Sequence, residues 1–227
     1  MMPRVFARLV FDAALVSALL GAGAGTMGWS RAWWLVAVML AVRTASAVAV
    51  QRVSPALLAE RAAWPVHAGQ AARDRVLVVA VLATGFLGLP LVAALDVWRW
   101  RPGPALDARL APLGLLAFAL GWALKGVALY TNAHAVPTVR LQAERAHRVV
   151  DTGVYAWIRH PFYAADPLIH VGLALWLGSA AAAVAAVVPI GLMLVRLQHE
   201  EAVLRAGLPG YAGYVARVPY RLVPGVW

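Results

Sequence analysis

Long apolar stretches separated by shorter polar segments organise the chain. Six of them stand out, at residues 5–25, 32–50, 75–96, 111–131, 163–178 and 180–197. The first four are long enough to cross a hydrocarbon core of about 30 Å, which takes about 20 helical residues. The last two meet at Leu177-Gly178-Ser179, which predicts a tight helical hairpin; one long segment broken there is the alternative. The pattern predicts an all-α fold, a polytopic membrane helix bundle of about six transmembrane segments that includes a C-terminal helical hairpin.

Composition agrees with a membrane location. Hydrophobic residues make up 63% of the chain and charged residues 13%, and the mean hydropathy is +0.74. A soluble domain has about 45–50% apolar and about 25% charged residues, and a fold of this size has too little interior to bury so much apolar surface. The chain also has no cysteine, which excludes thiolate nucleophiles, cysteine-ligated zinc and iron–sulfur clusters.

The distribution of basic residues predicts the orientation. With six segments, fourteen arginines fall on one side: Arg4, Arg8, Arg52, Arg61, Arg73, Arg75, Arg140, Arg145, Arg148, Arg159, Arg196, Arg205, Arg217 and Arg221. Four fall on the other: Arg31, Arg99, Arg101 and Arg109. Because cytoplasmic loops carry the excess of basic residues, both termini are predicted to be cytoplasmic. A topology with five segments would place the three or four C-terminal arginines on the other side and weaken this excess. The net charge of +10 then reflects orientation, and no nucleic-acid partner is expected.

No linker or repeat divides the chain, so a single integral membrane domain is predicted for residues 1–227. Residues 1–131 would form four N-terminal spans. Residues 132–227 would form a cofactor-binding catalytic region that includes the last two spans, with its polar segments, residues 137–163 and 198–227, on the cytoplasmic side. The composition is rich in Ala, Arg and Gly and contains a single lysine, Lys125. This is typical of a GC-rich bacterial genome and favours a bacterial inner membrane.

Polar residues gather first between Asn132 and Tyr163. Within this stretch Arg159 and His160 directly precede Pro161, and proline is favoured at the first position of a helix. The pair is therefore expected beside the backbone N–H groups that open the fifth segment, a place that suits a carboxylate or a phosphate. For the arginines of residues 139–150, contact with anionic lipid headgroups is the plainer interpretation.

The second gathering is Glu200-Glu201, at the predicted cytoplasmic end of the sixth segment. Acidic residues there oppose the helix dipole by about 0.3–1 kcal/mol each, so a bound cation or diol is expected, with simple solvation as the alternative. His199-Glu200-Glu201 lacks the spacing of HExxH, and no metal site is predicted. Together the two gatherings suit a ligand with an anionic end, a cationic group and an adenosine. S-adenosylmethionine and a nicotinamide dinucleotide both remain open from the residues alone.

Three motifs resemble those of the isoprenylcysteine carboxyl methyltransferase family. The segment Gly153-Val-Tyr155-Ala-Trp-Ile-Arg159-His160-Pro161-Phe-Tyr163 resembles its GPYxxxRHPxYxG signature, and Glu200-Glu201 resembles its EE pair. The terminal Arg217-Val-Pro219-Tyr-Arg-Leu-Val-Pro224-Gly-Val-Trp227 is similar to its RVPxRLxPGxW. The likeness is strong from about Asn132 onward and includes Gln142 and His147; Pro55–Arg61 is similar to a loop of bacterial members. Val154 and Ala165 depart from the usual Pro and Gly, which bears on the substrate class.

The resemblance implies an integral membrane methyltransferase that binds S-adenosylmethionine in a cytoplasmic pocket without a Rossmann domain. A lipophilic or prenylated acceptor would enter sideways from the bilayer lipids. Carried over by position, the cofactor site would be lined by His147, Val150, Gly153, Tyr155, His160, Pro161, Tyr163, Glu200 and Glu201. Arg159 and Arg217 are the candidate catalytic residues, because they would hold the carboxylate of the substrate or cofactor.

The expected reaction is O-methylation of a carboxylate such as a prenylcysteine C-terminus. A carboxylate is already ionised at neutral pH, so the protein must supply placement and exclusion of water rather than a general base. Replacing Glu201 or His160 with alanine is then expected to abolish cofactor binding and leave the protein folded.

Three other functions remain as alternatives. A phospholipid or amine N-methyltransferase has a similar RHPxY and EE arrangement but needs a base, because its amine must lose a proton. An NADPH-dependent sterol-type reductase commonly carries RHPNY, and Phe162 in the asparagine position counts against it. A non-enzymatic lipid-binding membrane protein is favoured only by Ala165.

Overall fold

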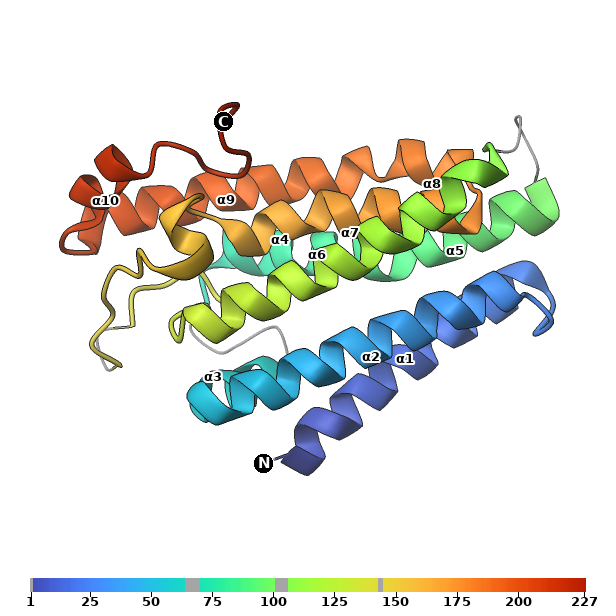
Figure 1. Cartoon of the computed structure of the whole chain (residues 1–227), viewed down its shortest axis with the longest axis horizontal. Coiled ribbons are helices and arrows are strands. Elements are labelled where there is room, and N and C mark those ends of the chain that lie inside the picture. Colours follow the sequence, from blue (N-terminus) through green and yellow to red (C-terminus); the bar gives the residue numbers. More distant parts are fainter. Residues whose placement is uncertain (1, 64–69, 101–105, 143–144) are drawn as a thin grey trace.

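The computed structural model describes residues 2–63, 70–100, 106–142 and 145–227, and every regular element in these ranges is helical. Arg101 lies outside them. The long helices run side by side in one bundle (Figure 1). In chain order they are α1 (Met2–Ala24), α2 (Ser30–Val53), α3 (Pro55–Ala62), α4 (Ala72–Val81), α5 (Leu89–Leu95), α6 (Ala111–Thr131), α7 (Pro161–Leu177), α8 (Ala180–Ala185), α9 (Val187–Gly207) and α10 (Tyr211–Arg217).

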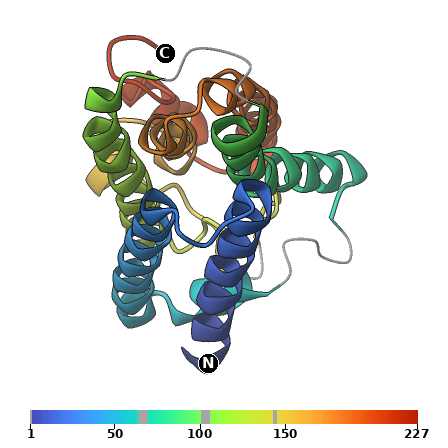
Figure 2. The same cartoon turned by 90° about the vertical axis from the view of Figure 1, so that its right-hand side faces the viewer.

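Short non-α turns complete the chain path. A π-helical stretch at Leu82–Gly88 joins α4 and α5, and a second one at Asp96–Trp100 extends α5, so that Ala72–Trp100 is one continuous helical crossing. Short 3-10 turns lie at Ala108–Leu110 and Gly153–Ala156. Viewed along the helices, α1 and α2 form one side of the bundle (Figure 2). They are joined to the rest by packing of α2 on α6 and of α1 on α5.

The number of membrane crossings agrees with the sequence pattern. Within the described residues, five helical segments are long and apolar enough to span a membrane: Met2–Ala24, Ser30–Val53, Ala72–Trp100, Ala108–Thr131 and Ala180–Gly207. Helix α7 has 17 residues, at the lower end of the range for a span. Because both termini lie at the same end of the bundle (Figure 1), the number of crossings is even, and α7 is the sixth. The predicted bundle of about six segments is confirmed.

The predicted hairpin is also present, and the alternative of one interrupted segment is excluded. Gly178 ends α7 in a left-handed conformation with φ of 79°, which glycine adopts without a steric penalty. Ser179 then caps α8, since its hydroxyl accepts a hydrogen bond from the Ala182 N–H. Helices α8 and α9 return along the bundle, and α9 continues to Gly207.

Charged side chains inside the crossings are paired. Arg43 lies 2.5 Å from Asp12, Lys125 lies 2.8 Å from Asp166, and Arg196 lies 2.9 Å from Asp74. Charges within membrane segments are costly unless they face the bundle interior and meet a partner. Each pair joins two different helices, α1 with α2, α6 with α7, and α4 with α9.

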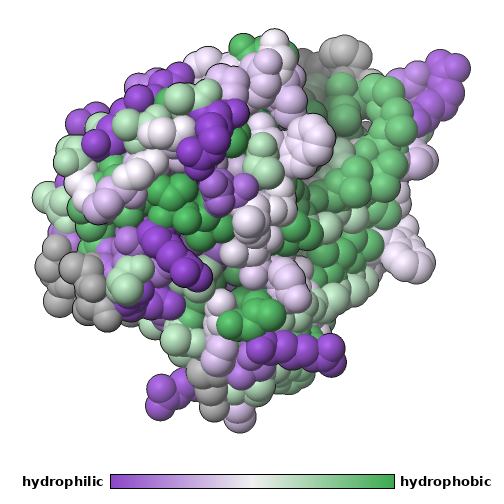
Figure 3. Space-filling model, turned by 60° about the vertical axis from the view of Figure 1, so that its left-hand side comes forward, coloured by the Kyte–Doolittle hydropathy of each residue, from purple (hydrophilic) through white to green (hydrophobic). Residues whose placement is uncertain are grey.

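Hydrophilic residues gather at one end of the molecule, while hydrophobic side chains cover its flank (Figure 3). That end carries both termini, α3, α10 and the segment between α6 and α7 (Figure 1). An apolar flank with a polar end is the surface expected of an integral membrane protein whose active region faces water.

Helices α6 and α7 approach closely at glycines. A Cβ added at Gly172 would lie 2.6 Å from the Phe118 nitrogen and 2.7 Å from the Gly114 oxygen. Both atoms belong to the backbone of α6, so the helices would have to separate. Small residues allow this type of close packing between membrane helices.

Replacing Gly172 with alanine is therefore expected to destabilise the protein by about 1–3 kcal/mol, the usual cost of overpacking. Thermal unfolding in detergent measures the change. Gly191 is the matched control, because a Cβ there has nothing within 4 Å and alanine is the better helix former. Equal melting temperatures for the Gly172→Ala and Gly191→Ala proteins would contradict the role of the α6–α7 contact.

Candidate functional site

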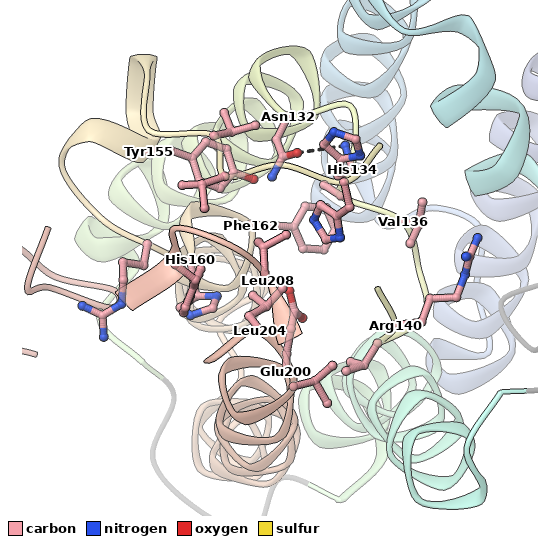
Figure 4. Close-up of a pocket in the computed structure, with 18 of the residues that line it drawn as sticks. Asn132, His134, Val136, Arg140, Tyr155, His160, Phe162, Glu200, Leu204 and Leu208 are labelled. Atoms are coloured by element: carbon pink, nitrogen blue, oxygen red, sulfur yellow. Dashed lines mark hydrogen bonds between the residues drawn. The ribbon is translucent and has the colours of Figure 1, made fainter. Parts of the chain in front are cut away.

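A polar pocket lies at the hydrophilic end of the bundle, where α6, α7 and α9 meet the segment between Asn132 and His160 (Figure 4). It encloses about 860 Å³, counting the space at its mouth. Glu200, Leu204 and Leu208 enter from the α9 side, and Tyr155 and His160 from the segment before α7. The wall also contains Arg61, Asn132, His134, Arg140, His147, Arg148, Val150, Arg159, Phe162, Tyr163, Arg196, Tyr211 and Tyr214.

The C-terminal tail holds the Arg159-His160 segment in place. The Arg159 N–H donates to the Tyr220 carbonyl and the His160 N–H to the Arg221 carbonyl, both at 2.9 Å. The tail itself folds back, because the Leu222 N–H donates to the Trp227 carbonyl at 2.9 Å. The two motifs at residues 153–163 and 217–227 are therefore parts of one wall, held together through their backbones.

Glu201 is the centre of a cluster of arginines. Its carboxylate lies 2.7 Å from the Arg159 guanidinium, 2.5 Å from Arg221 and 3.3 Å from Arg205. The side chains of Arg159 and Glu201 are only 3% and 4% exposed, and Arg159 Nη1 donates to the Val218 carbonyl at 2.7 Å. This cluster joins α9, the start of α7 and the tail, and it holds the pocket wall from behind.

Helix α9 continues beyond Glu201 to Gly207, so the two glutamates do not lie at its terminus. The unfavourable effect of the helix dipole is confined to the last turn of a helix, so it does not act on these two glutamates as the sequence suggested. Glu201 instead forms ion pairs with the arginine cluster, and Glu200 lines the pocket.

Glu200 faces the pocket and takes part in a second chain of contacts. The Tyr163 hydroxyl donates to Glu200 Oε2 at 2.5 Å, and Arg196 Nη1 donates to the same hydroxyl oxygen at 2.8 Å. Arg196 is in turn fixed by Asp74, whose side chain is fully buried. These contacts fix the orientation of the Glu200 carboxylate at the surface of the pocket.

Three histidines in the wall are held neutral near pH 7. Burial, and then the neighbouring His134, lower the pKa of His147 to about 4. Burial is also the main cause of the lowered pKa values of His134 and His160. The rings of His134 and His147 lie 4.6 Å apart with a 31° tilt. Among the described residues, neither His134 Nδ1 nor His160 Nε2 has a hydrogen-bond partner, so both nitrogens are available to a ligand.

The structure brings most of the sequence-predicted residues to one place. Seven line the pocket: His147, Val150, Tyr155, Arg159, His160, Tyr163 and Glu200. Four do not: Gly153, which turns with φ of 56° against Thr131; Pro161, which opens α7; Glu201; and Arg217. The Arg217 side chain is 62% exposed and lies 2.7 Å from Asp151.

Ala165, which departs from the motif, packs away from the pocket. It is fully buried in the main hydrophobic cluster between α6 and α7, and its carbonyl faces Gly121. A methyl group there affects helix packing and leaves the pocket wall unchanged.

Several wall residues escaped the sequence analysis. The sequence identified Arg196 only as an orientation charge, Arg61 only as such a charge and as part of a loop similar to one of bacterial members, and Phe162 only as a residue that counts against a reductase. Tyr211 and Tyr214 come from α10, which packs against the wall, and the Tyr214 hydroxyl donates to the Tyr155 carbonyl at 2.8 Å. Repeated aromatic residues in the tail were the available signal, but their partners lie about 60 residues away in the chain.

An apolar cavity of about 1170 Å³, counting the space at its openings, adjoins the polar pocket. Its wall is formed by side chains of α1, α2, α4, α6, α7 and α9, such as Leu35, Met39, Phe118 and Met193. Arg61, Phe162, Tyr163 and Arg196 line both spaces. The polar and apolar spaces therefore meet around the start of α7.

Known proteins resemble this chain in sequence and in fold. Residues 113–206 match the sequence profile of the isoprenylcysteine carboxyl methyltransferase family. A solved structure of a eukaryotic intramembrane Ras methyltransferase, an isoprenylcysteine carboxyl methyltransferase, has a similar fold. The likeness covers 94% of this chain and 74% of that one, with a TM-score of 0.58 and 19% sequence identity. No curated protein sequence gives a match.

Proposed function

We propose that the chain, whose residues 113–206 match the sequence profile of the isoprenylcysteine carboxyl methyltransferase family, methylates a lipophilic acid with S-adenosylmethionine as methyl donor. The observation that carries the proposal is the junction of a polar pocket with an apolar cavity at Phe162 and Tyr163. A cofactor with charged groups suits the first space and a hydrocarbon tail the second. Both termini and the pocket would face the cytoplasm of a bacterial inner membrane.

The pocket residues fit an adenosyl ligand with an amino-acid end. Glu200 offers a carboxylate to an ammonium group or a ribose diol, and its orientation is set by Tyr163. His160 Nε2 and His134 Nδ1 are buried without partners among the described residues, and burying such atoms is costly unless something binds them. These residues, with Tyr155 and His147, would hold the cofactor.

When bound, S-adenosylmethionine supplies a methyl group on a positively charged sulfur, which keeps the bonding electrons as the acceptor oxygen takes the methyl. The residues of the chain place the acceptor and exclude water. Positioning of this kind contributes about 7–11 kcal/mol when the reacting atoms are held in line. No side chain needs to accept a proton, because a carboxylate with a pKa of about 3.5 is already ionised.

Calorimetric titration of detergent-purified protein with S-adenosylmethionine and with NADPH tests the reaction class. Binding of S-adenosylmethionine alone is expected. Binding of NADPH alone would overturn the proposal in favour of a reductase. Binding of neither by a folded sample would also overturn it and favour a lipid-binding protein.

The rate of methyl transfer is expected to be independent of pH between about pH 7 and about pH 8. Burial lowers the pKa of His147 to about 4 and lowers the pKa values of His134 and His160 from the usual value of about 6.5, so all three rings stay mostly neutral in this range. The acceptor carboxylate is ionised throughout it. The measurement is kcat/KM for a carboxylate acceptor across the range. A rate that rises with pH would contradict this expectation, because it would require a group in the site to lose a proton before methyl transfer.

A further inference from the structure

Arg61 occupies the point where the internal spaces of the protein meet. It lies in the last turn of α3 and lines the polar pocket, the apolar cavity and a third space between α1, α2 and α6. Its Nε donates to the Ala135 carbonyl at 2.7 Å, and its Cζ lies 4.3 Å from the centre of the Phe162 ring. The backbone carbonyl and the ring fix the plane of the guanidinium.

Among the described residues no acidic side chain pairs with the Arg61 guanidinium, and the contact to Ala135 uses one of its five N–H groups. The adjacent Glu60 is engaged elsewhere, 3.1 Å from Arg145 and 3.4 Å from Arg140. Burial lowers the pKa of Arg61 to about 10, the effect expected of a cation removed from water.

The other arginines near the junction are already bound. Each of the three Arg159 guanidinium nitrogens has a partner, Nε and Nη2 in Glu201 and Nη1 in the Val218 carbonyl. Arg196 donates to Asp74, to Tyr163 and to the Pro137 carbonyl, each through a different nitrogen. Arg217, the other candidate from the sequence, is exposed and paired with Asp151.

We propose that Arg61 binds the carboxylate of the acceptor at the junction and thereby selects acids over amines and neutral lipids. The inference rests on the proposed function and specifies its substrate class. Arginine presents a planar fork that matches both oxygens of a carboxylate. An acceptor held in this way has its charged end between the two spaces, its tail in the apolar cavity and its oxygen towards the polar pocket.

The test compares the binding of N-acetyl-S-farnesylcysteine with that of its primary amide, which has the same tail but no charge. The wild-type protein is expected to bind the acid at least about tenfold more tightly, as for a hydrogen bond between charged groups. The Arg61→Met protein is expected to bind the two about equally. The Arg61→Lys protein should recover part of the preference, because it keeps the charge and loses the fork.

Arg52→Met is the matched control, since Arg52 is an exposed arginine in the last turn of α2, and it should retain the wild-type preference. The inference is overturned if Arg61→Met keeps the full preference, or if the wild-type protein does not distinguish the two compounds. Binding is measured without methyl transfer. A protein that prefers the acid through Arg61 but binds no S-adenosylmethionine would therefore refute the proposed reaction and still support this site.

Discussion

Replacing Glu201 with alanine is expected to lower the free energy of unfolding by about 3–5 kcal/mol, the range observed when one partner of a buried ion pair is removed. Arg159 would remain buried without a counterion, and Arg221 and Arg205 would lose the carboxylate they share. For a protein of this size the melting temperature should fall by about 10 °C. Thermal unfolding in detergent and the rate of proteolysis of the tail measure the effect.

The neighbouring Glu200→Ala substitution is the control, because it removes the same atoms from an adjacent residue of the same helix. Glu200 contacts the Tyr163 hydroxyl and has no place in the arginine cluster, so stability should change by about 1 kcal/mol or less. Unchanged melting of the Glu201→Ala protein would show that the cluster does not hold the tail. The sequence motif alone predicts a loss of cofactor binding in a folded protein, and the contacts of Glu201 indicate a loss of stability instead.

Replacing Glu200 with glutamine is expected to weaken the binding of S-adenosylmethionine by about 10-fold to 100-fold. Glutamine keeps an oxygen that accepts from the Tyr163 hydroxyl, so the wall retains its shape, but the negative charge is lost. Hydrogen bonds to charged groups contribute about 1.5–3 kcal/mol, which corresponds to this range. Calorimetric titration of the wild-type and variant proteins gives the ratio of dissociation constants.

Asp151→Asn provides the comparison for this experiment. Asp151 is an acidic residue at the same end of the molecule, and its partner is the exposed Arg217, so it should bind S-adenosylmethionine as the wild type does. Equal affinities of the wild-type and Glu200→Gln proteins would remove Glu200 from the cofactor site. An equal loss in both variants would indicate a general effect of negative charge at this surface.

The sequence by itself determined the helices, their number and the approximate site. Runs of about 20 apolar residues have one stable arrangement in a bilayer, because every backbone N–H and carbonyl must be satisfied within the segment. Pro161 and Gly178 fixed the ends of α7 through their own backbone preferences. The resemblance of residues 153–163 and of Glu200 to family motifs then indicated residues of the pocket, although Tyr163 and Glu200 are 37 residues apart in the chain.

Only the tertiary structure decided what each charged side chain does. Glu200 and Glu201 are adjacent on α9, yet one faces the pocket and the other three arginines, because neighbouring helical residues point about 100° apart. The sequence indicated Arg159 and not Arg61 as a carboxylate-binding residue, but Glu201 neutralises the buried Arg159, and Arg61 has no acidic partner among the described residues. Electrostatic roles depend on distances between residues remote in the chain, and the order of residues does not specify those distances until the helices pack.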